Sequence, residues 1–118
     1  MSGHNYGAFS ELPGQEPFPG VNRNAFSSAH STVTSYNFEP GGTFPIHRHP
    51  EEQVTLILEG TVHFTVDGVE HKLGPGEWSV IDGGIEHGII AGADGARFIA
   101  IVSPARQRSD QYEVVGSE

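Results

Sequence analysis

Residues 41–60 read GGTFPIHRHPEEQVTLILEG, and this stretch contains most of the evidence for the fold. Two runs of β-favouring residues, 43–47 and 53–58, follow a pair of turn-forming glycines. His47 and His49 are two positions apart, so in an extended chain their side chains project from the same face. The stretch therefore predicts two strands joined by a short turn, with two imidazoles side by side on one face.

Similar runs continue over the rest of the chain, separated by turns rich in Gly and Pro. The predicted strands cover residues 31–38, 43–47, 53–58, 61–66, 69–73, 78–81, 86–91 and 97–102. Asp67-Gly68 is a strong signal for a two-residue hairpin, because both turn positions need a positive φ. No apolar period of 3.6 residues persists beyond a turn or two. The pattern predicts an all-β fold, an antiparallel sandwich or barrel.

The length of 118 residues corresponds to one domain. Residues 1–20 are polar and rich in Gly and Pro, which predicts a flexible N-terminal arm. The barrel is expected over residues 21–104. Residues 105–118 form a polar C-terminal tail, for which a short helix and irregular structure both remain open.

Composition excludes several classes of partner. Six Lys and Arg against 15 Asp and Glu give a net charge of −9, which disfavours nucleic acid and anionic membrane surfaces. No apolar stretch is long enough for a transmembrane helix, and the N-terminus lacks the pattern of a signal peptide. Cysteine is absent, so disulfides, thiolate nucleophiles and Cys-ligated metals are excluded. A cytoplasmic protein with a small-molecule substrate is the expectation.

The histidines suggest a metal site. His87 lies on another predicted strand, and with His47 and His49 it supplies three imidazoles. Gln53 adds a side-chain carbonyl oxygen, and such a donor set suits a divalent ion. The alternative is a group of polar residues that line the barrel without a metal. His63 alternates with Val62 and Phe64, so its side chain points to the other side of the strand from theirs.

Two stretches resemble the motifs of the cupin family. Residues 41–60 resemble the first motif, Gly-x5-His-x-His-x(3–4)-Glu-x6-Gly, with Gln53 at the usual Glu position. Residues 76–91, GEWSVIDGGIEHGIIA, resemble the second, Gly-x5-Pro-x-Gly-x2-His-x3-Asn, with Asp82 in place of Pro and Ala91 in place of Asn. The resemblance covers roughly residues 30–103.

This resemblance implies a cupin-type antiparallel β-barrel, a jelly-roll-like double sheet. It also implies a divalent metal ion (Zn, Ni, Fe or Mn) with His47, His49, Gln53 and His87 as the ligands. A neutral amide in place of a carboxylate binds the ion more weakly. It also leaves the full charge on the metal, which makes the metal a stronger Lewis acid.

The set of three His and one Gln resembles small single-domain cupins typified by the pectin-degradation family, which opens 4,5-unsaturated galacturonate. That resemblance implies isomerase or lyase chemistry on a small oxygenated, sugar-acid-like substrate. Of that family's pocket residues only the Arg is retained, as Arg106, while Ala100 and Val102 stand at the Asp and aromatic positions. An oxygen-dependent dioxygenase and a non-catalytic sugar-binding module remain open.

The catalytic candidates are few. Arg106 or Arg108 is expected to hold a substrate carboxylate, and a solvated tail is the alternative for both. Glu51 and His63 are the candidate proton carriers. Tyr36 and Trp78 are expected in the pocket or, with greater weight, in the core or barrel wall.

The alternation of side chains also predicts a contact between chains. If Gln53 points inward, then Val54, Leu56 and Leu58 point outward and form an apolar patch. We expect a homodimer with residues 53–58 near the interface. The alternative is that the N-terminal arm alone covers the patch.

Overall fold

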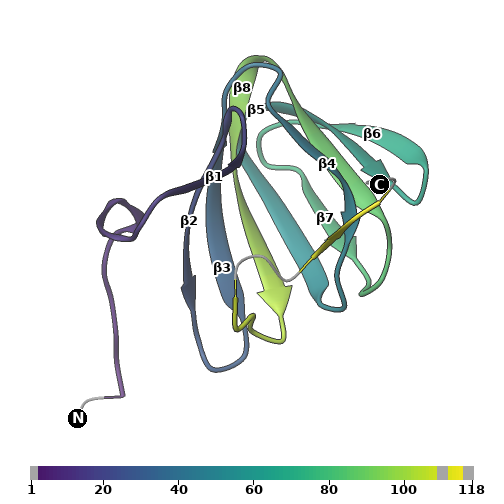
Figure 1. The fold of residues 1–118 in the computed structure, drawn as a ribbon. Helices are drawn as coiled ribbons and strands as arrows, with labels where there is room; N and C mark the ends of the chain where they lie inside the picture. Colours follow the sequence, from purple (N-terminus) through teal and green to yellow (C-terminus); the bar gives the residue numbers. More distant parts are fainter. Residues whose placement is uncertain (1–2, 109–111, 116–118) are drawn as a thin grey trace.

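The computed structural model describes residues 3–108 and 112–115, and nearly all of its regular structure is antiparallel strand (Figure 1). The strands are β1 (Gln15–Phe18), β2 (Val21–Ser27), β3 (Thr32–Phe38), β4 (Thr43–Arg48), β5 (Glu52–Val66), β6 (Val69–Leu73), β7 (Trp78–Ile81), β8 (His87–Ser103) and β9 (Glu113–Val114). One turn of 3₁₀ helix, Phe9–Glu11, precedes them. The all-β prediction is confirmed.

The strands form a single curled sheet in the order β1-β2-β3-β8-β4-β9, and β5 pairs with β6, β7 and β8. The two longest strands, β5 and β8, pair along almost their whole lengths. Each was predicted as two separate strands, and this prediction is wrong. At Gly60 the pairing of β5 with β8 shifts in register but does not end. A Cβ at Gly60 would lie 2.1 Å from the Gly95 carbonyl oxygen. This close glycine contact lets the ladder bend without ending, so one sheet wraps around the core.

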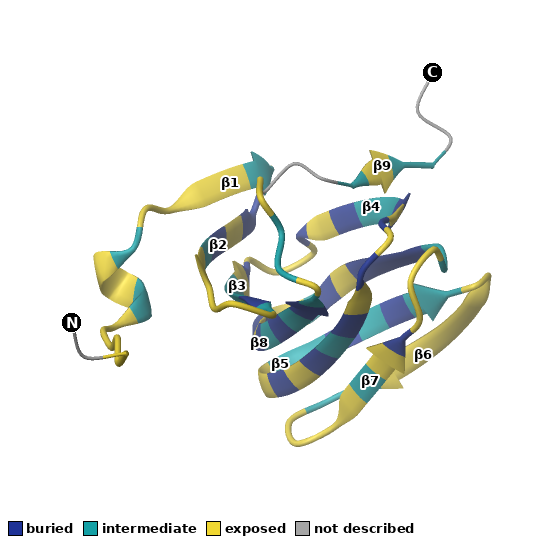
Figure 2. Cartoon of the chain, turned by 90° about the horizontal axis from the view of Figure 1, so that it is seen from below, coloured by how far each residue is buried: buried dark blue, intermediate teal, exposed yellow. Residues whose placement is uncertain are grey.

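Buried and exposed side chains alternate along the strands, as the colours of Figure 2 show for β5 and β8. The side chains that point inward form a single apolar core, which includes Val21, Phe38, Phe44, Ile57, Val62, Phe64, Ile81, Ile89 and Phe98. On β5 the same inward face continues from Ile57 through Thr55 to Gln53, which are all buried. The polar site therefore lies at one end of the barrel interior.

Both ends of the chain contribute strands. β1 pairs with β2, so the sheet begins at Gln15, inside the segment expected to be a flexible arm; residues 1–2 lie outside the described part. In the C-terminal tail, β9 pairs with β4, where a short helix or irregular structure was expected. Residues 109–111 and 116–118 of that tail lie outside the described part.

Within the described residues, no helix has the length and apolar character needed to cross a bilayer.

Candidate metal centre

Three histidines that are far apart in the sequence meet inside the barrel. The ring nitrogens of His47, His49 and His87 that face one another all lie within 4.8 Å, and the three residues are buried. His47 on β4 is the direct partner of His87 on β8 in the antiparallel ladder, and their ring centroids are 4.2 Å apart. The His49 ring lies 4.9 Å from that of His87. The predicted convergence of the three imidazoles is therefore present in the fold.

A close contact between two loops brings His87 to the other two histidines. The Gly84 amide donates to the His49 carbonyl oxygen at 2.8 Å. A Cβ on Gly83 would lie 2.1 Å from the Pro50 carbonyl oxygen, so only glycine fits at this position. The turn before β8 is thus hydrogen-bonded to His49, directly after β4. This contact keeps His87 close to His47 and His49.

Each imidazole is oriented by a backbone carbonyl. The Nδ1 atoms of His47 and His87 contact the carbonyl oxygens of Pro45 and Ile85, at 2.8 and 2.9 Å. His49 Nδ1 contacts the Glu51 carbonyl oxygen at 3.1 Å. A carbonyl oxygen only accepts, so each Nδ1 carries the hydrogen and each Nε2 keeps its lone pair. All three rings therefore present an acceptor nitrogen to the common centre.

The His87 Nε2 atom is the only buried side-chain nitrogen or oxygen in residues 3–108 and 112–115 that has no hydrogen-bond partner. A buried lone pair without a partner is costly. A metal ion would satisfy it together with the Nε2 atoms of His47 and His49. The chemistry of the site thus fits a bound cation.

Burial keeps the imidazoles neutral. Burial first, and the nearby His87 ring second, lower the pKa of His47 to about 3. Burial lowers the pKa of His87 to about 4. The pKa of His49 is also lowered, by burial first and by the charge of Arg106 second. Neutral imidazole is the form that binds metal, so the rings are ready to bind at neutral pH.

Gln53 lies beside the three histidines. Its Oε1 atom lies 3.1 Å from His49 Nε2, and its amide nitrogen donates to the Thr55 hydroxyl at 3.0 Å. This second bond turns the carbonyl end of the amide toward the histidines. Two acceptor atoms at this distance repel each other unless both bind the same cation. The Gln53 carbonyl oxygen thus lies beside the three histidines, and its role as a fourth ligand stays a prediction.

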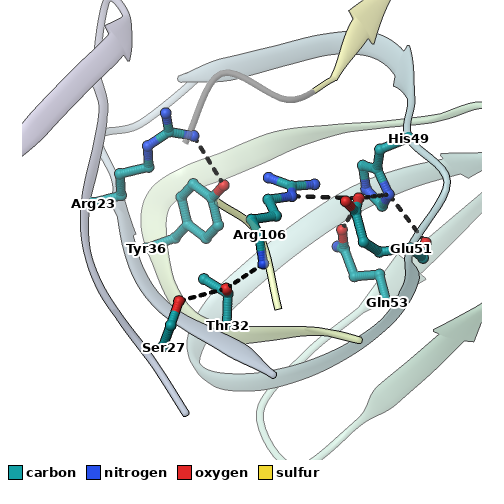
Figure 3. A network of polar contacts seen from close by, with 8 residues as sticks. All are labelled: Arg23, Ser27, Thr32, Tyr36, His49, Glu51, Gln53 and Arg106. Carbon is teal, nitrogen blue, oxygen red and sulfur yellow. Dashed lines mark hydrogen bonds and ion pairs between the residues drawn. The ribbon is translucent and has the colours of Figure 1, made fainter. Parts of the chain in front are cut away.

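A charged pair borders the centre, as Figure 3 shows. Glu51 Oε1 lies 3.3 Å from His49 Nδ1 and 3.4 Å from Arg106 Nε. The Glu51 side chain is only 9% exposed, although its position in the sequence suggested a solvated turn residue. The Arg106 backbone amide donates to Thr32 Oγ1 at 2.8 Å, which fixes the start of the tail against β3. Both candidates thus join the site.

Other candidates lie elsewhere. His63 projects from β5 away from the core, and its Nδ1 lies 3.5 Å from Glu70 Oε2 in an exposed pair. Arg108 is exposed. Trp78 is 66% exposed, so it lies in neither the pocket nor the core, and its strand β7 forms part of the barrel wall. Its alternation on β7 places it on the outer side of the sheet, opposite Leu56.

Aromatic rings form the wall above the histidines. Tyr36 and Phe44 line a cavity of about 20 Å³ that also reaches His47, Gln53 and His87, enough for one ion or water. The ring centroids of Phe44 and His47 are 4.3 Å apart. Tyr112 lies 5.6 Å from His47. Sequence reasoning missed Tyr112, whose only signal is an aromatic residue in a polar tail.

A buried arginine near the site was also missed. Arg23 is 7% exposed, and its Nη1 donates to the Tyr36 hydroxyl at 3.4 Å while its Nε donates to Gln15. Nothing in the sequence around Arg23 sets it apart from an exposed residue on a strand. Its effect is to hold the Tyr36 ring, which stacks on Phe98 with a centroid distance of 5.0 Å.

Comparison with known proteins gives consistent results. A family model described as "Cupin domain" matches residues 34–102. The chain is 36% identical over 80 residues to dimethylsulfoniopropionate lyase DddW from Ruegeria pomeroyi; the match covers 68% of this chain and 53% of the relative, so the chain spans about half the length of that protein.

Two solved structures share the fold. An RmlC-like cupin from Shewanella frigidimarina has a TM-score of 0.80 at 24% identity, over 88% of this chain and 94% of that one. KdgF from Halomonas sp. has a TM-score of 0.77 at 23% identity, over 86% of this chain and 97% of that one.

Proposed function

Because the chain belongs to the cupin family, we propose that it is a divalent-metal-dependent lyase that acts on a small carboxylate. The observation that carries the proposal is the convergence of three neutral imidazole Nε2 atoms beside Glu51 and Arg106. In this proposal His47, His49, Gln53 and His87 hold the ion. The similarity to dimethylsulfoniopropionate lyase supports the lyase class.

The donor set determines what the ion contributes. All four donors are neutral, so they leave the positive charge of the ion uncompensated. When bound, a divalent ion would supply Lewis acidity that stabilises negative charge on a substrate oxygen. Zn, Ni, Fe and Mn all suit imidazole and carbonyl donors.

Arg106 is the proposed carboxylate anchor. Its Nε contacts Glu51, and its two Nη atoms make no side-chain bond to any residue in 3–108 or 112–115. A guanidinium held at one end presents its remaining donors in a fixed plane, which suits a carboxylate. The backbone bond from Arg106 to Thr32 limits its movement. Arg106 is therefore positioned to orient an anionic substrate beside the histidines.

Glu51 is the proposed general base. Both of its contacts, with His49 and with Arg106, use Oε1. Oε2 has no bond to the part of the chain that the structure describes. In the proposed step, Glu51 Oε2 takes the proton from the carbon next to the substrate carboxylate. The electron pair of that C–H bond forms a C=C bond, and the leaving group departs from the β-carbon with the pair of its own bond.

The aromatic wall suits a cationic leaving group. Tyr36, Phe44 and Tyr112 present π-faces and edges near His47, and such rings attract a cation that carries no hydrogen-bond donor. Dimethylsulfoniopropionate combines a carboxylate with a sulfonium, so it matches Arg106 at one end and the rings at the other. Its elimination yields acrylate and dimethyl sulfide. It is therefore the first substrate to test.

The test is turnover with defined metals. Metal-free protein is supplied in turn with Zn²⁺, Ni²⁺, Fe²⁺ or Mn²⁺ and then with dimethylsulfoniopropionate, and dimethyl sulfide is measured by gas chromatography. We expect product with at least one metal. Glu51→Gln should lower kcat by about 10²-fold or more, while His63→Gln, the matched control on the outer side of β5, keeps the wild-type rate.

Other outcomes identify the competing classes. Oxygen uptake with a carboxylate substrate would indicate a dioxygenase. Turnover of an unsaturated uronate without dimethyl sulfide release would indicate the sugar-acid reaction. Saturable binding with no product from either substrate would indicate a binding module. Each of these results contradicts the proposed elimination.

A further inference from the structure

The carboxylate of Glu51 lies between His49 and Arg106, as Figure 3 shows. Its Oε1 atom is 3.3 Å from His49 Nδ1 and 3.4 Å from Arg106 Nε. The side chains of His49, Glu51 and Arg106 are 1%, 9% and 12% exposed. Water and salt screen charges in such surroundings only weakly. A change in charge at Arg106 therefore reaches Glu51 and, through it, His49.

The two ring nitrogens of His49 have different neighbours. Nδ1 contacts the Glu51 carbonyl oxygen at 3.1 Å and lies next to the Glu51 carboxylate, whereas Nε2 lies 3.1 Å from Gln53 Oε1, on the side of the proposed ion. A carboxylate beside the N–H group of an imidazole increases the basicity of the ring and makes the other nitrogen a better metal donor. Glu51 is therefore placed to act on an ion through the His49 ring.

Arg106 opposes this effect of Glu51. Its guanidinium contacts the same Oε1 atom that faces His49, so it compensates the negative charge there. The pKa of His49 is lowered by burial first and by the charge of Arg106 second, and the charge of Glu51 acts in the opposite direction. The two side chains thus have opposite electrostatic effects on one and the same metal-binding ring.

We propose that Glu51 is a positioning residue that couples anion binding at Arg106 to metal affinity at His49. The inference rests on the proposed function, from which it takes the metal centre and the carboxylate anchor. A carboxylate on the Nη donors of Arg106 compensates the guanidinium charge, so Glu51 Oε1 interacts more strongly with His49. The ion is then held more tightly. By thermodynamic linkage, the ion increases the affinity for the anion by the same factor.

Metal titrations in the presence and absence of propionate measure this coupling. Propionate carries a carboxylate and no leaving group, so the titration does not depend on turnover. Metal-free full-length protein is titrated with Zn²⁺ against a competing dye, and sodium chloride at equal ionic strength is the reference. We expect propionate to increase the Zn²⁺ affinity of the wild type at least about fivefold.

Two single substitutions should change Zn²⁺ affinity in opposite directions. Glu51→Gln removes the negative charge beside His49 Nδ1 and should lower the affinity about 10-fold to 100-fold. Arg106→Met removes the opposing positive charge and should raise the affinity at least about threefold. In both variants propionate should lose its effect on the Zn²⁺ affinity. Glu59→Gln and Arg97→Met are the matched controls, because this Glu–Arg pair is exposed, and both should keep the wild-type values.

A measurement without metal separates this role from a merely structural one. In metal-free Glu51→Gln, the guanidinium of Arg106 has lost its carboxylate partner and is available to another anion. Its affinity for propionate, measured by NMR titration, should rise at least about threefold above that of the wild type. Damage to the site would instead weaken the binding of Zn²⁺ and propionate together.

The results are independent of the test of elimination. If dimethyl sulfide is released but propionate leaves the wild-type Zn²⁺ affinity unchanged, the coupling is wrong and the proposed function stands. If no dimethyl sulfide is released but propionate and the two variants act as expected, the coupling stands and the proposed reaction is wrong. Wild-type Zn²⁺ affinity in Glu51→Gln, or a change of the same sign in Glu51→Gln and Arg106→Met, overturns the proposal.

Discussion

The Nε2 atom of His49 and the Oε1 atom of Gln53 lie 3.1 Å apart, and neither carries a hydrogen when the amide donates to Thr55 and His49 Nδ1 donates to the Glu51 carbonyl. Both residues are buried, and a separation of 3.1 Å leaves no space for a water molecule between the two atoms. Two facing acceptors are costly in isolation and favourable around a cation. The pair is therefore the sharpest indicator of a metal ion at this site.

Gln53→Glu should increase metal affinity and lower turnover. A carboxylate attracts a divalent ion more strongly than an amide does, and it reduces the charge left to activate the substrate. We expect at least about tenfold tighter binding, measured by competition with a metallochromic dye. Thr55→Val should have the opposite effect, because it removes the hydroxyl that orients the Gln53 amide. Metal affinity should then fall by about 10-fold to 100-fold. Equal affinities in all three proteins would contradict the role of Gln53.

His49→Ala should abolish metal binding. The variant removes one of three imidazole donors and the partner of Gln53. In protein purified without chelators or nickel columns, metal per chain should fall at least about tenfold by elemental analysis, and added metal should no longer raise Tm. His63→Ala removes an exposed histidine and should change neither value. Wild-type protein that holds no metal and gains no stability from added Zn²⁺, Ni²⁺, Mn²⁺ or Fe²⁺ would refute the metal centre.

Acid should destabilise the metal-free protein in a defined range. Burial lowers the pKa of His47 to about 3 and the pKa of His87 to about 4, from the ordinary histidine value of 6.5. Below pH 6.5 the unfolded chain therefore binds protons that the folded chain does not, and the free energy of unfolding falls as pH falls. The expected slope is about 1.4 kcal/mol per pH unit for each of these histidines.

Urea unfolding of the metal-free protein at a series of pH values measures this slope. His47→Gln should reduce it, because the variant removes one of the groups with a lowered pKa. His63→Gln should leave it unchanged. A free energy of unfolding that does not change between pH 6.5 and pH 4 would show that the folded imidazoles are protonated there.

The convergence of the histidines and the direction of the β5 side chains were predictable from the sequence. Side chains in a strand alternate strictly, so the positions of His47, His49 and Gln53 decide which neighbours face outward. Val54, Leu56 and Leu58 accordingly lie on the outer side of β5, intermediate or exposed. The side-chain directions depend on local geometry, which the sequence contains, whereas the approach of His87 to the other two histidines was implied by the resemblance to the two motifs.

Features that depend on distant contacts were not predictable. Gly60 resembles the end of a strand in the sequence, yet it allows a bend because the Gly95 carbonyl approaches it. Glu51 resembles a turn residue, and only the tail that carries Arg106 buries it. Tyr112 reaches His47 because β9 pairs with β4. In each case a segment far along the chain determines the environment.

Arg106→Met should impair binding of the anionic substrate. The change removes the donors proposed for the carboxylate and keeps much of the side-chain volume. We expect kcat/KM to fall by about 10²-fold to 10³-fold, a range typical of lost charged hydrogen bonds in an active site. Arg108→Met tests the other arginine, which is exposed, and should change kcat/KM little. A larger loss for Arg108→Met than for Arg106→Met would reverse the assignment.

Gly83→Ala should move His87 away from His49. The new Cβ would lie 2.1 Å from the Pro50 carbonyl oxygen, a backbone atom that moves only with the end of β4. That movement displaces His49 from His87, because the Gly84 amide bond to the His49 carbonyl joins the same two loops. We expect a loss of about 1–3 kcal/mol of stability and a metal affinity at least about tenfold lower. Gly74→Ala is the matched control, since its Cβ would meet only side-chain atoms at 3.7 and 3.8 Å, which is ordinary contact. If calorimetry and metal titration give the same values for both variants, the loop contact does not position the histidines.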